Sequence, residues 1–123
     1  MVEVICDTSF LIHLATHNIK NLDSINTEIG QIQFVVPSVV LNELRKLSKT
    51  QKKKQDAVTT LEFARKLKTT EMSGKFADQV IIERVRKRGG MIATVDNELK
   101  NKIKRLGGSV MSFSNDKIVL ESQ

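Results

Sequence analysis

The chain has 123 residues, a single cysteine and a formal charge of +6, with a pI near 9.6. This length suits one domain with its own core, and one cysteine excludes an intramolecular disulfide and fits a reduced, intracellular setting. No apolar run approaches the ~20 residues of a membrane span, and no basic leader precedes the first strand. We therefore expect one cytoplasmic domain over residues 1–123, with no membrane partner.

The chain starts with a run that predicts a short buried strand. Residues 2–6 are almost all β-branched or apolar, and Asp7, Thr8 and Ser9 follow them directly. Ligands of open α/β sheets gather at the carboxyl ends of strands. Polar side chains at this place therefore mark a candidate site.

Helices and a second strand follow. Residues 10–15 predict a short buried helix, residues 18–29 a second helix, and residues 32–36 a second strand. The next predicted helix covers residues 39–48. On a helical wheel Glu43 lies among the apolar residues of this helix, where a carboxylate is unexpected.

The middle of the chain repeats this anomaly. A polar, basic link leads to a predicted helix over residues 57–67, and residues 69–74 predict a short edge strand. Residues 76–88 then show helical spacing. Asp78 falls inside the apolar arc of that helix.

In the last third of the chain, another predicted strand is followed by an acid, as the first strand is. Residues 91–95 predict a buried strand followed by Asp96, and a basic helix with apolar Leu99 and Ile103 ends at Gly107. Residues 109–113 predict a last strand. Strands separated by helices of this length predict an α/β fold with a parallel sheet covered on both faces.

Four carboxylates thus occupy unusual places, two after strands and two on apolar helix faces. Buried carboxylates are tolerated when they are hydrogen-bonded, paired with cations or bound to metal. All-oxygen ligation favours Mg²⁺ or Mn²⁺ over zinc, and such an ion can take phosphate oxygens and activate water. The candidate metal-binding and catalytic residues are Asp7, Glu43, Asp78 and Asp96.

Each acid also has a structural explanation. Asp7 and Asp96 could cap the helices that follow them. Asp78 could interact with a helix dipole, and Glu43 could pair with a basic residue of a neighbouring helix. These four explanations are independent, whereas convergence on one site explains all four acids together.

The four acidic segments resemble the motifs of PIN-domain nucleases. They are Asp7-Thr8-Ser9 after the first strand, Val36 to Leu44 around Glu43, Ala77-Asp78-x-x-Ile81, and Ala93-Thr94-x-Asp96-x-x-Leu99. The resemblance covers the whole chain, and residues 92–111 are most similar to the group of VapC-like toxins and ribosome-processing PIN proteins.

The resemblance implies a three-layer α/β/α PIN-like domain that acts as a metal-dependent endoribonuclease. It implies that the four acids hold one or two Mg²⁺ or Mn²⁺ ions, and that Thr8, Ser9 or Thr94 orients a ligand or water. In-line attack by water would leave 5′-phosphate and 3′-hydroxyl ends. It also implies a homodimer and either an antitoxin or a ribosome-assembly partner.

Two positions depart from the pattern of this group. Many relatives carry a second acid beside the third motif acid, where this chain has Gln79. Many also carry a polar residue before the fourth acid, where this chain has Val95. Both departures weaken the expectation of a second metal ion.

The positive charge comes in clusters that favour a polyanionic partner, although a solvated lysine-rich surface is the alternative. Two clusters, at residues 45–54 and 100–105, are the candidates for binding the RNA backbone. Their candidate residues are Arg45, Lys46, Lys49, Lys52, Lys53, Lys100 and Lys104.

Three other functions compete with the nuclease. A non-catalytic RNA-binding or ribosome-assembly module could use the same fold, but it has no reason to gather four acids. A receiver-like or phosphatase domain needs an acid where Ser9 stands. His13 and His17 have the i, i+4 spacing of a zinc pair, but Leu14 occupies the position of the metalloprotease glutamate.

Overall fold

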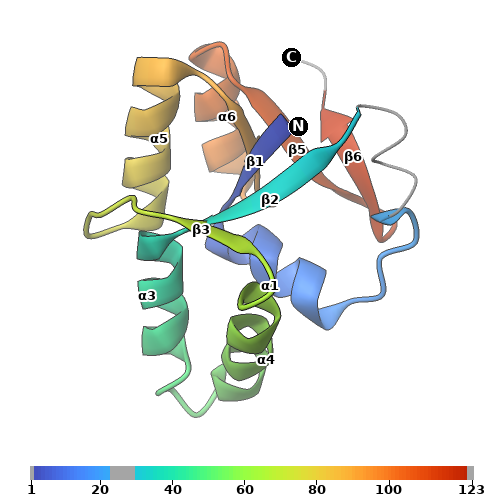
Figure 1. The fold of residues 1–123 in the computed structure, drawn as a ribbon, viewed down its shortest axis with the longest axis vertical. Coiled ribbons are helices and arrows are strands. Elements are labelled where there is room, and N and C mark those ends of the chain that lie inside the picture. Colours follow the sequence, from blue (N-terminus) through green and yellow to red (C-terminus); the bar gives the residue numbers. More distant parts are fainter. Residues whose placement is uncertain (1, 23–29, 122–123) are drawn as a thin grey trace.

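A computed structural model describes residues 2–22 and 30–121 (Figure 1). Its elements in chain order are β1 (Val2–Cys6), α1 (Thr8–Thr16), β2 (Ile32–Pro37), α3 (Ser38–Leu47), α4 (Lys54–Ala64), β3 (Lys68–Thr70), α5 (Ala77–Arg88), β4 (Met91–Ala93), α6 (Asn97–Arg105), β5 (Ser109–Ser114) and β6 (Lys117–Glu121). No helix of this part of the chain is long and apolar enough to cross a bilayer.

The strands form one sheet in the order β3-β2-β1-β4-β5-β6. The pairs β3–β2, β2–β1, β1–β4 and β4–β5 are parallel, whereas β5–β6 is antiparallel. The predicted α/β fold is confirmed, but the expected parallel sheet is parallel only as far as β5. Because the strand order reverses direction at β1, the carboxyl ends of β1 and β4 flank the switch point where such sheets bind ligands.

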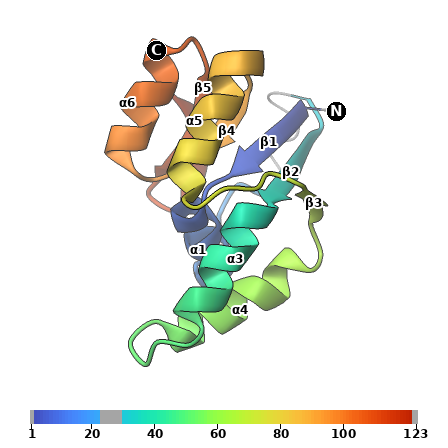
Figure 2. The same ribbon diagram turned by 90° about the vertical axis from the view of Figure 1, so that its left-hand side faces the viewer.

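Helices cover both faces of the sheet (Figures 1 and 2). Side chains alternate along each strand, so Val4 and Cys6 pack with α1 and α3 on one face. Ile5 points to the other face and packs with α5 and α6. The layers are therefore α/β/α, and Cys6 is a fully buried core residue whose thiol pKa is raised by burial.

Several predicted boundaries were wrong by a few residues. α4 begins three residues before the predicted helix begins and ends three residues before it ends. The earlier end follows because residues 65–67 form a turn, with a bond from Leu67 N–H to Ala64 O, and β3 starts at Lys68, where it pairs with Val35. β3 ends at Thr70 rather than continuing to residue 74. The predicted helix over 18–29 lies largely outside the described residues, and residues 18–21 are not helical.

The strand β6 was not predicted from the sequence. β5 and β6 are joined by Asn115 and Asp116, which have φ angles of 52° and 59°. Two successive residues with positive φ make the tight turn of a hairpin, whose commonest sequences end in glycine. The Asn-Asp pair lacks that glycine, so the signal for a hairpin was weak.

β6 is fixed to α6 by its last residue. Glu121 accepts hydrogen bonds from Lys100, Lys104 and the hydroxyl of Ser112, and its ammonium partners lie 2.7 and 2.8 Å away. Burial opposes ionisation of Glu121, but these donors outweigh it and lower its pKa to about 2. The carboxylate therefore joins the antiparallel strand to the helix that packs behind it.

Replacing Glu121 by glutamine should lower the free energy of unfolding at neutral pH by roughly 2 kcal/mol, because hydrogen bonds between charged groups are lost. Since the pKa of Glu121 is lower in the folded chain than its ordinary 4.5, its contribution is complete above that value and disappears as the pH falls towards 2. Thermal unfolding at several pH values tests this. Glu62→Gln, at an exposed position on α4, is the matched control, and an equal effect of both variants would contradict the prediction.

Candidate active site

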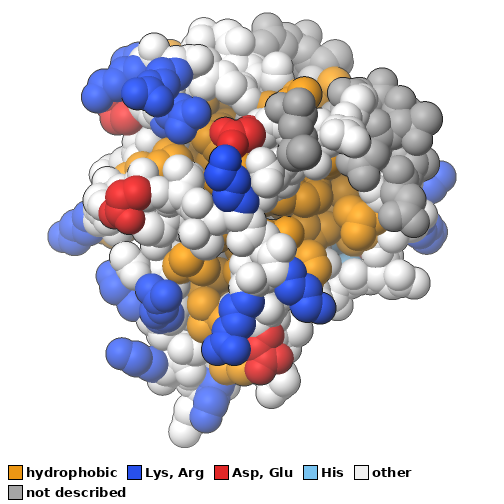
Figure 3. Space-filling view, viewed as in Figure 1, with side chains coloured by type: hydrophobic (Ala, Val, Ile, Leu, Met, Phe, Trp, Pro, Cys, Tyr) orange, Lys and Arg blue, Asp and Glu red, His pale blue; other side chains and the backbone are white. Residues whose placement is uncertain are grey.

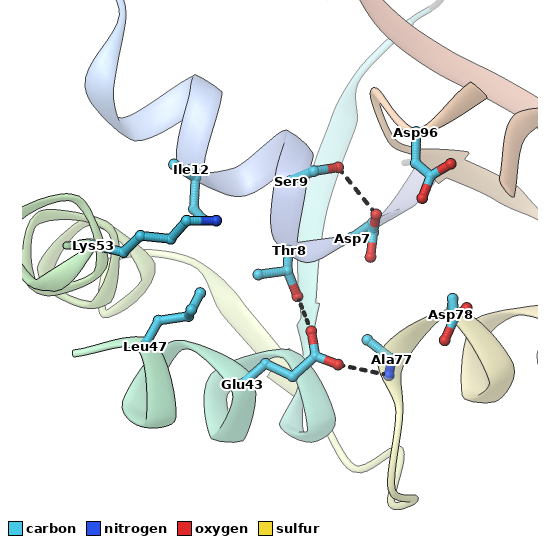
Figure 4. Close-up of a pocket in the computed structure, with 10 residues that line it drawn as sticks. All are labelled: Asp7, Thr8, Ser9, Ile12, Glu43, Leu47, Lys53, Ala77, Asp78 and Asp96. Atoms are coloured by element: carbon cyan, nitrogen blue, oxygen red, sulfur yellow. Dashed lines mark hydrogen bonds between the residues drawn. The ribbon is translucent and has the colours of Figure 1, made fainter. Parts of the chain in front are cut away.

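The four predicted acids line a single cavity of about 320 Å³ at the carboxyl end of the sheet (Figure 4). Asp7 follows β1 and Asp96 follows β4, and these two strands are adjacent: the N–H of Asp7 donates to Ala93 O across them, at 2.9 Å. Glu43 comes from α3 and Asp78 from the first turn of α5. The cavity is lined by Asp7, Thr8, Ser9, Ile12, Glu43, Leu47, Lys53, Ala77, Asp78 and Asp96.

Asp7 is the buried member of the group, with 8% of its surface exposed. Its Oδ2 accepts hydrogen bonds from Thr94 Oγ1 at 2.9 Å and Ser9 Oγ at 3.1 Å. Burial raises the pKa of this carboxyl, and the bonds from Thr94 and Ser9 oppose the rise. Asp7 occupies the N-cap position of α1, but its side chain makes no capping bond, so capping does not explain the carboxylate.

Glu43 connects two helix starts. Its Oε1 accepts a bond from Thr8 Oγ1 at 2.7 Å, and its Oε2 accepts one from the N–H of Ala77 at 2.9 Å (Figure 4). The second bond satisfies an amide that α5 cannot satisfy internally. No described Lys or Arg forms an ion pair with Glu43, so its partners are not the basic residues that the alternative explanation required.

The other two acids are exposed. Asp96 Oδ1 caps α6 by accepting from the amides of Glu98 and Leu99, as its structural explanation predicted. Asp78 was expected on the apolar face of its helix, but it is exposed where the first turn of α5 meets the cavity. Its Oδ1 accepts from the amide of Gln79.

Thr94 joins the two strand ends. It is fully buried, and its hydroxyl donates to Asp7 Oδ2 while accepting from the N–H of Asp96 at 3.1 Å. With Thr8 on Glu43 and Ser9 on Asp7, all three predicted supporting hydroxyls contact a candidate acid or its backbone. These hydrogen bonds restrict the orientation of Glu43 and Asp7, and the predicted role of the hydroxyls toward a ligand or water stays a prediction.

Three helices begin beside this cavity. The first residues of α1, α5 and α6 are Thr8, Ala77 and Asn97, each next to a cavity-lining acid or its partner. Each helix start carries a partial positive charge of roughly half an elementary charge. These three partial charges offset part of the repulsion among the four carboxylates.

The donor set suits a hard divalent cation, because every candidate ligand is a carboxylate oxygen. No three acidic, histidine or cysteine side chains of the described residues stand close enough together to hold one ion as they lie here. Asp78 and Asp96 are exposed, and their hydrogen bonds use Oδ1. Within the described part of the chain, Oδ2 of each side chain is therefore not engaged in a hydrogen bond. Glu43 is fixed through both oxygens, and its assignment as a ligand stays a prediction.

The basic residues predicted to bind RNA divide into two sets. Residues of the first set are exposed on α3 and on the link to α4, and Lys53 lines the cavity itself (Figure 4). Figure 3 shows Lys and Arg side chains gathered over this lower part of the molecule. The first set is Arg45, Lys46, Lys49, Lys52 and Lys53. The second set, Lys100 and Lys104, is engaged with Glu121 instead.

The histidine pair stacks rather than opening toward a metal. The rings of His13 and His17 lie 3.8 Å apart and nearly parallel, and His13 Nε2 lies 3.2 Å from Asp116. His13 also packs on the ring of Phe113. This arrangement explains the spacing of the two histidines by packing.

Sequence and structure comparisons identify relatives. Residues 4–115 match the model of a family described as PIN like domain. No curated protein matches the sequence.

Among solved structures, the PIN domain endonuclease Utp24 is 26% identical, with a TM-score of 0.80 over 98% of this chain and 92% of that chain. VapBC2 from Rickettsia felis, solved bound to a DNA fragment from their promoter, is 15% identical with a TM-score of 0.64 over 93% and 100%. A domain of a functionally unknown protein from Methanocaldococcus jannaschii is 16% identical with a TM-score of 0.57 over 100% and 96%. The last two likenesses support the fold alone.

The burial of Asp7 gives a test of the geometry without any ligand. Asp7→Asn should stabilise the metal-free protein at neutral pH by roughly 1 kcal/mol, because a buried charge is removed while the hydrogen-bond acceptor remains. Because the pKa of Asp7 is raised in the folded chain, the stability difference between variant and unchanged protein decreases as the pH falls through that pKa. It is zero below the ordinary value of 3.8.

The matched control is Asp78→Asn in the same cavity, because Asp78 is exposed and this change should not stabilise the chain. Chemical denaturation in EDTA at several pH values measures both effects. A destabilised Asp7→Asn variant would show that ionised Asp7 is not the strained member of the group.

Proposed function

Because the chain belongs to the PIN-domain family, we propose that it is a divalent-metal-dependent endoribonuclease that hydrolyses RNA phosphodiester bonds with Mg²⁺ or Mn²⁺. The observation that carries this proposal is the convergence of Asp7, Glu43, Asp78 and Asp96 in one open cavity. They come from four separate elements, and structural roles alone do not require them to meet. Like charges at one place are costly unless a cation binds among them.

Some of these residues would hold the metal ion, and others fix the positions of the acids and of the helices beside the cavity. Asp7, Asp78 and Asp96 would hold the ion, which when bound supplies charge for the phosphate oxygens and lowers the pKa of a water. Thr94 and Ser9 keep Asp7 in one orientation through their hydrogen bonds. Glu43 keeps the starts of α1 and α5 in place beside the cavity through Thr8 and Ala77.

Lys53 gives the cavity its positive wall. Its side chain extends from the link before α4 into the cavity, across from the acids (Figure 4). An ammonium at this place can hold the phosphate that enters the cavity, and the exposed basic residues of α3 extend the surface outward. RNA is therefore the proposed substrate.

The runner-up remains a non-catalytic RNA-binding or assembly module on the same fold. A binder would tolerate loss of one acid, whereas a nuclease would not. Between the two kinds of named relatives, the endonuclease Utp24 has the higher identity and TM-score. This likeness supports an endonuclease over a binding module, whereas a ribosome-assembly partner, an antitoxin partner and a homodimer rest on the family resemblance.

Purified protein should cleave a labelled structured RNA with Mg²⁺ or Mn²⁺ and not with EDTA. Asp7→Asn should lose about 10²-fold or more of this rate, because a ligand to the catalytic ion is removed. Asp56→Asn, an exposed carboxylate on α4 outside the cavity, should cleave like the unchanged protein. Salt-sensitive RNA binding without cleavage, unchanged in Asp7→Asn, would support the binding module instead.

Divalent ions should also raise the melting temperature. Binding to the folded chain alone stabilises it by about 1.4 kcal/mol at ten times the dissociation constant, which corresponds to roughly 5 °C or more. The shift should be lost in Asp7→Asn and kept in Asp56→Asn. An equal shift in all three proteins would mean that the ions bind elsewhere.

A further inference from the structure

Three depressions follow one another along α5 and α6, which lie side by side on one face of the sheet (Figure 2). The carboxylate cavity shares Asp78 and Asp96 with a small depression of about 60 Å³. That depression shares Ile82 and Lys102 with a groove of about 320 Å³ at its outer end. The three depressions therefore adjoin one another, and together we call them the furrow.

The outer groove combines an apolar floor with basic walls. Ile82 is half-buried and Leu106 is 36% exposed, so the floor offers apolar surface to a ligand. The groove is lined by Ile82, Arg86, Lys102, Arg105 and Leu106.

The charges of the groove remain open to an anion. Arg86 and Lys102 form exposed ion pairs with Glu83 and Glu98 of their own helices, which a stronger anion can replace. Within the described part of the chain, no carboxylate pairs with Arg105.

The groove is lined by a different face of α6 from the face that carries Lys100 and Lys104, the residues predicted to bind RNA. At about 100° per residue, Lys102 lies only about 60° from Arg105 but about 160° from Lys100. Lys100 and Lys104 therefore turn toward β6 and Glu121, while Lys102 and Arg105 turn toward α5. The basic residues of α6 that are available to a ligand are Lys102 and Arg105.

We propose that this furrow binds one strand of RNA and leads it to the carboxylate cavity, a role that rests on the proposed nuclease function. Arg86, Lys102 and Arg105 contact its phosphates, and Ile82 and Leu106 contact the face of an unpaired base. The acids lie at the inner end and the cations at the outer end. Glu98 lies between them in the middle depression. A strand held by the outer cations reaches the acids at the inner end, where a bound divalent ion would offset their charge.

The composition of the outer groove favours a single strand. The apolar floor is of use only to bases that have left a stack. The outer groove therefore suits an unpaired segment of RNA.

The first test measures binding of a labelled single-stranded RNA in EDTA, where cleavage plays no part. The double variant Lys102→Ala/Arg105→Ala should lose about tenfold in affinity, and the slope of log affinity against log salt should fall by about 1.4. The control Arg65→Ala/Lys66→Ala removes the same charge from exposed positions after α4 and should bind within twofold of the unchanged protein.

The second test locates the strand directly. A photo-crosslinking residue at position 106 or at position 58 replaces a side chain that is 36% exposed in both cases. Single-stranded RNA should crosslink at position 106, on the groove, and not at position 58, on α4. A fully paired duplex should crosslink weakly at both.

Equal loss of affinity in both double variants, or equal crosslinking at both positions, would overturn the proposal. So would a Lys102→Ala/Arg105→Ala variant that binds RNA normally but changes its sedimentation, because the groove would then be a protein interface. Failure of the nuclease proposal would appear separately, as absent cleavage with the crosslink at position 106 retained.

Discussion

The structure depends on one electrostatic constraint, the placing of four carboxylates around a single cavity. Asp7 is buried, and like charges that lie close together repel, so the fold must compensate these charges even before any cation binds. Hydroxyls of Thr94, Ser9 and Thr8 donate to the carboxylates, and amides at the starts of α5 and α6 donate to Glu43 and Asp96. Only part of the charge is compensated, because burial still raises the pKa of Asp7.

The hydrogen bonds to the carboxylates also connect segments that are distant in the sequence. The parallel pairing of β1 with β4 brings Asp7 beside Thr94, and the two bonds of Glu43 join α3 to the starts of α1 and α5. The same bonds that stabilise the charges therefore hold the helices that surround the cavity. Structural roles for Glu43 and Asp96 are thus compatible with a catalytic site, since each side chain can position an element and still face the cavity.

The basic residues also divide into groups that lie in different surroundings. One pair of α6 lysines fixes β6 through Glu121, whereas the neighbouring face of the same helix turns basic residues toward a groove that reaches the acids. The basic residues of α3 and Lys53 lie on another side of the cavity. A net charge of +6 is therefore divided between structural ion pairs and surfaces suited to a polyanion.

The sequence by itself determined the fold class and the four acids, because hydrophobic periodicity is local and the strand ends of a parallel sheet meet at one edge. It placed β1, β2, β4, α3 and α5 within about two residues of their observed bounds. Only the tertiary structure decided the rest. β6 was not predicted because the Asn115-Asp116 turn before it lacks glycine. Asp78 is exposed, although its position on the helical wheel suggested burial. The partner of Lys100 and Lys104 was also not predicted, because Glu121 lies on β6, the strand that was missed. No local pattern records which face of α6 a distant strand will contact.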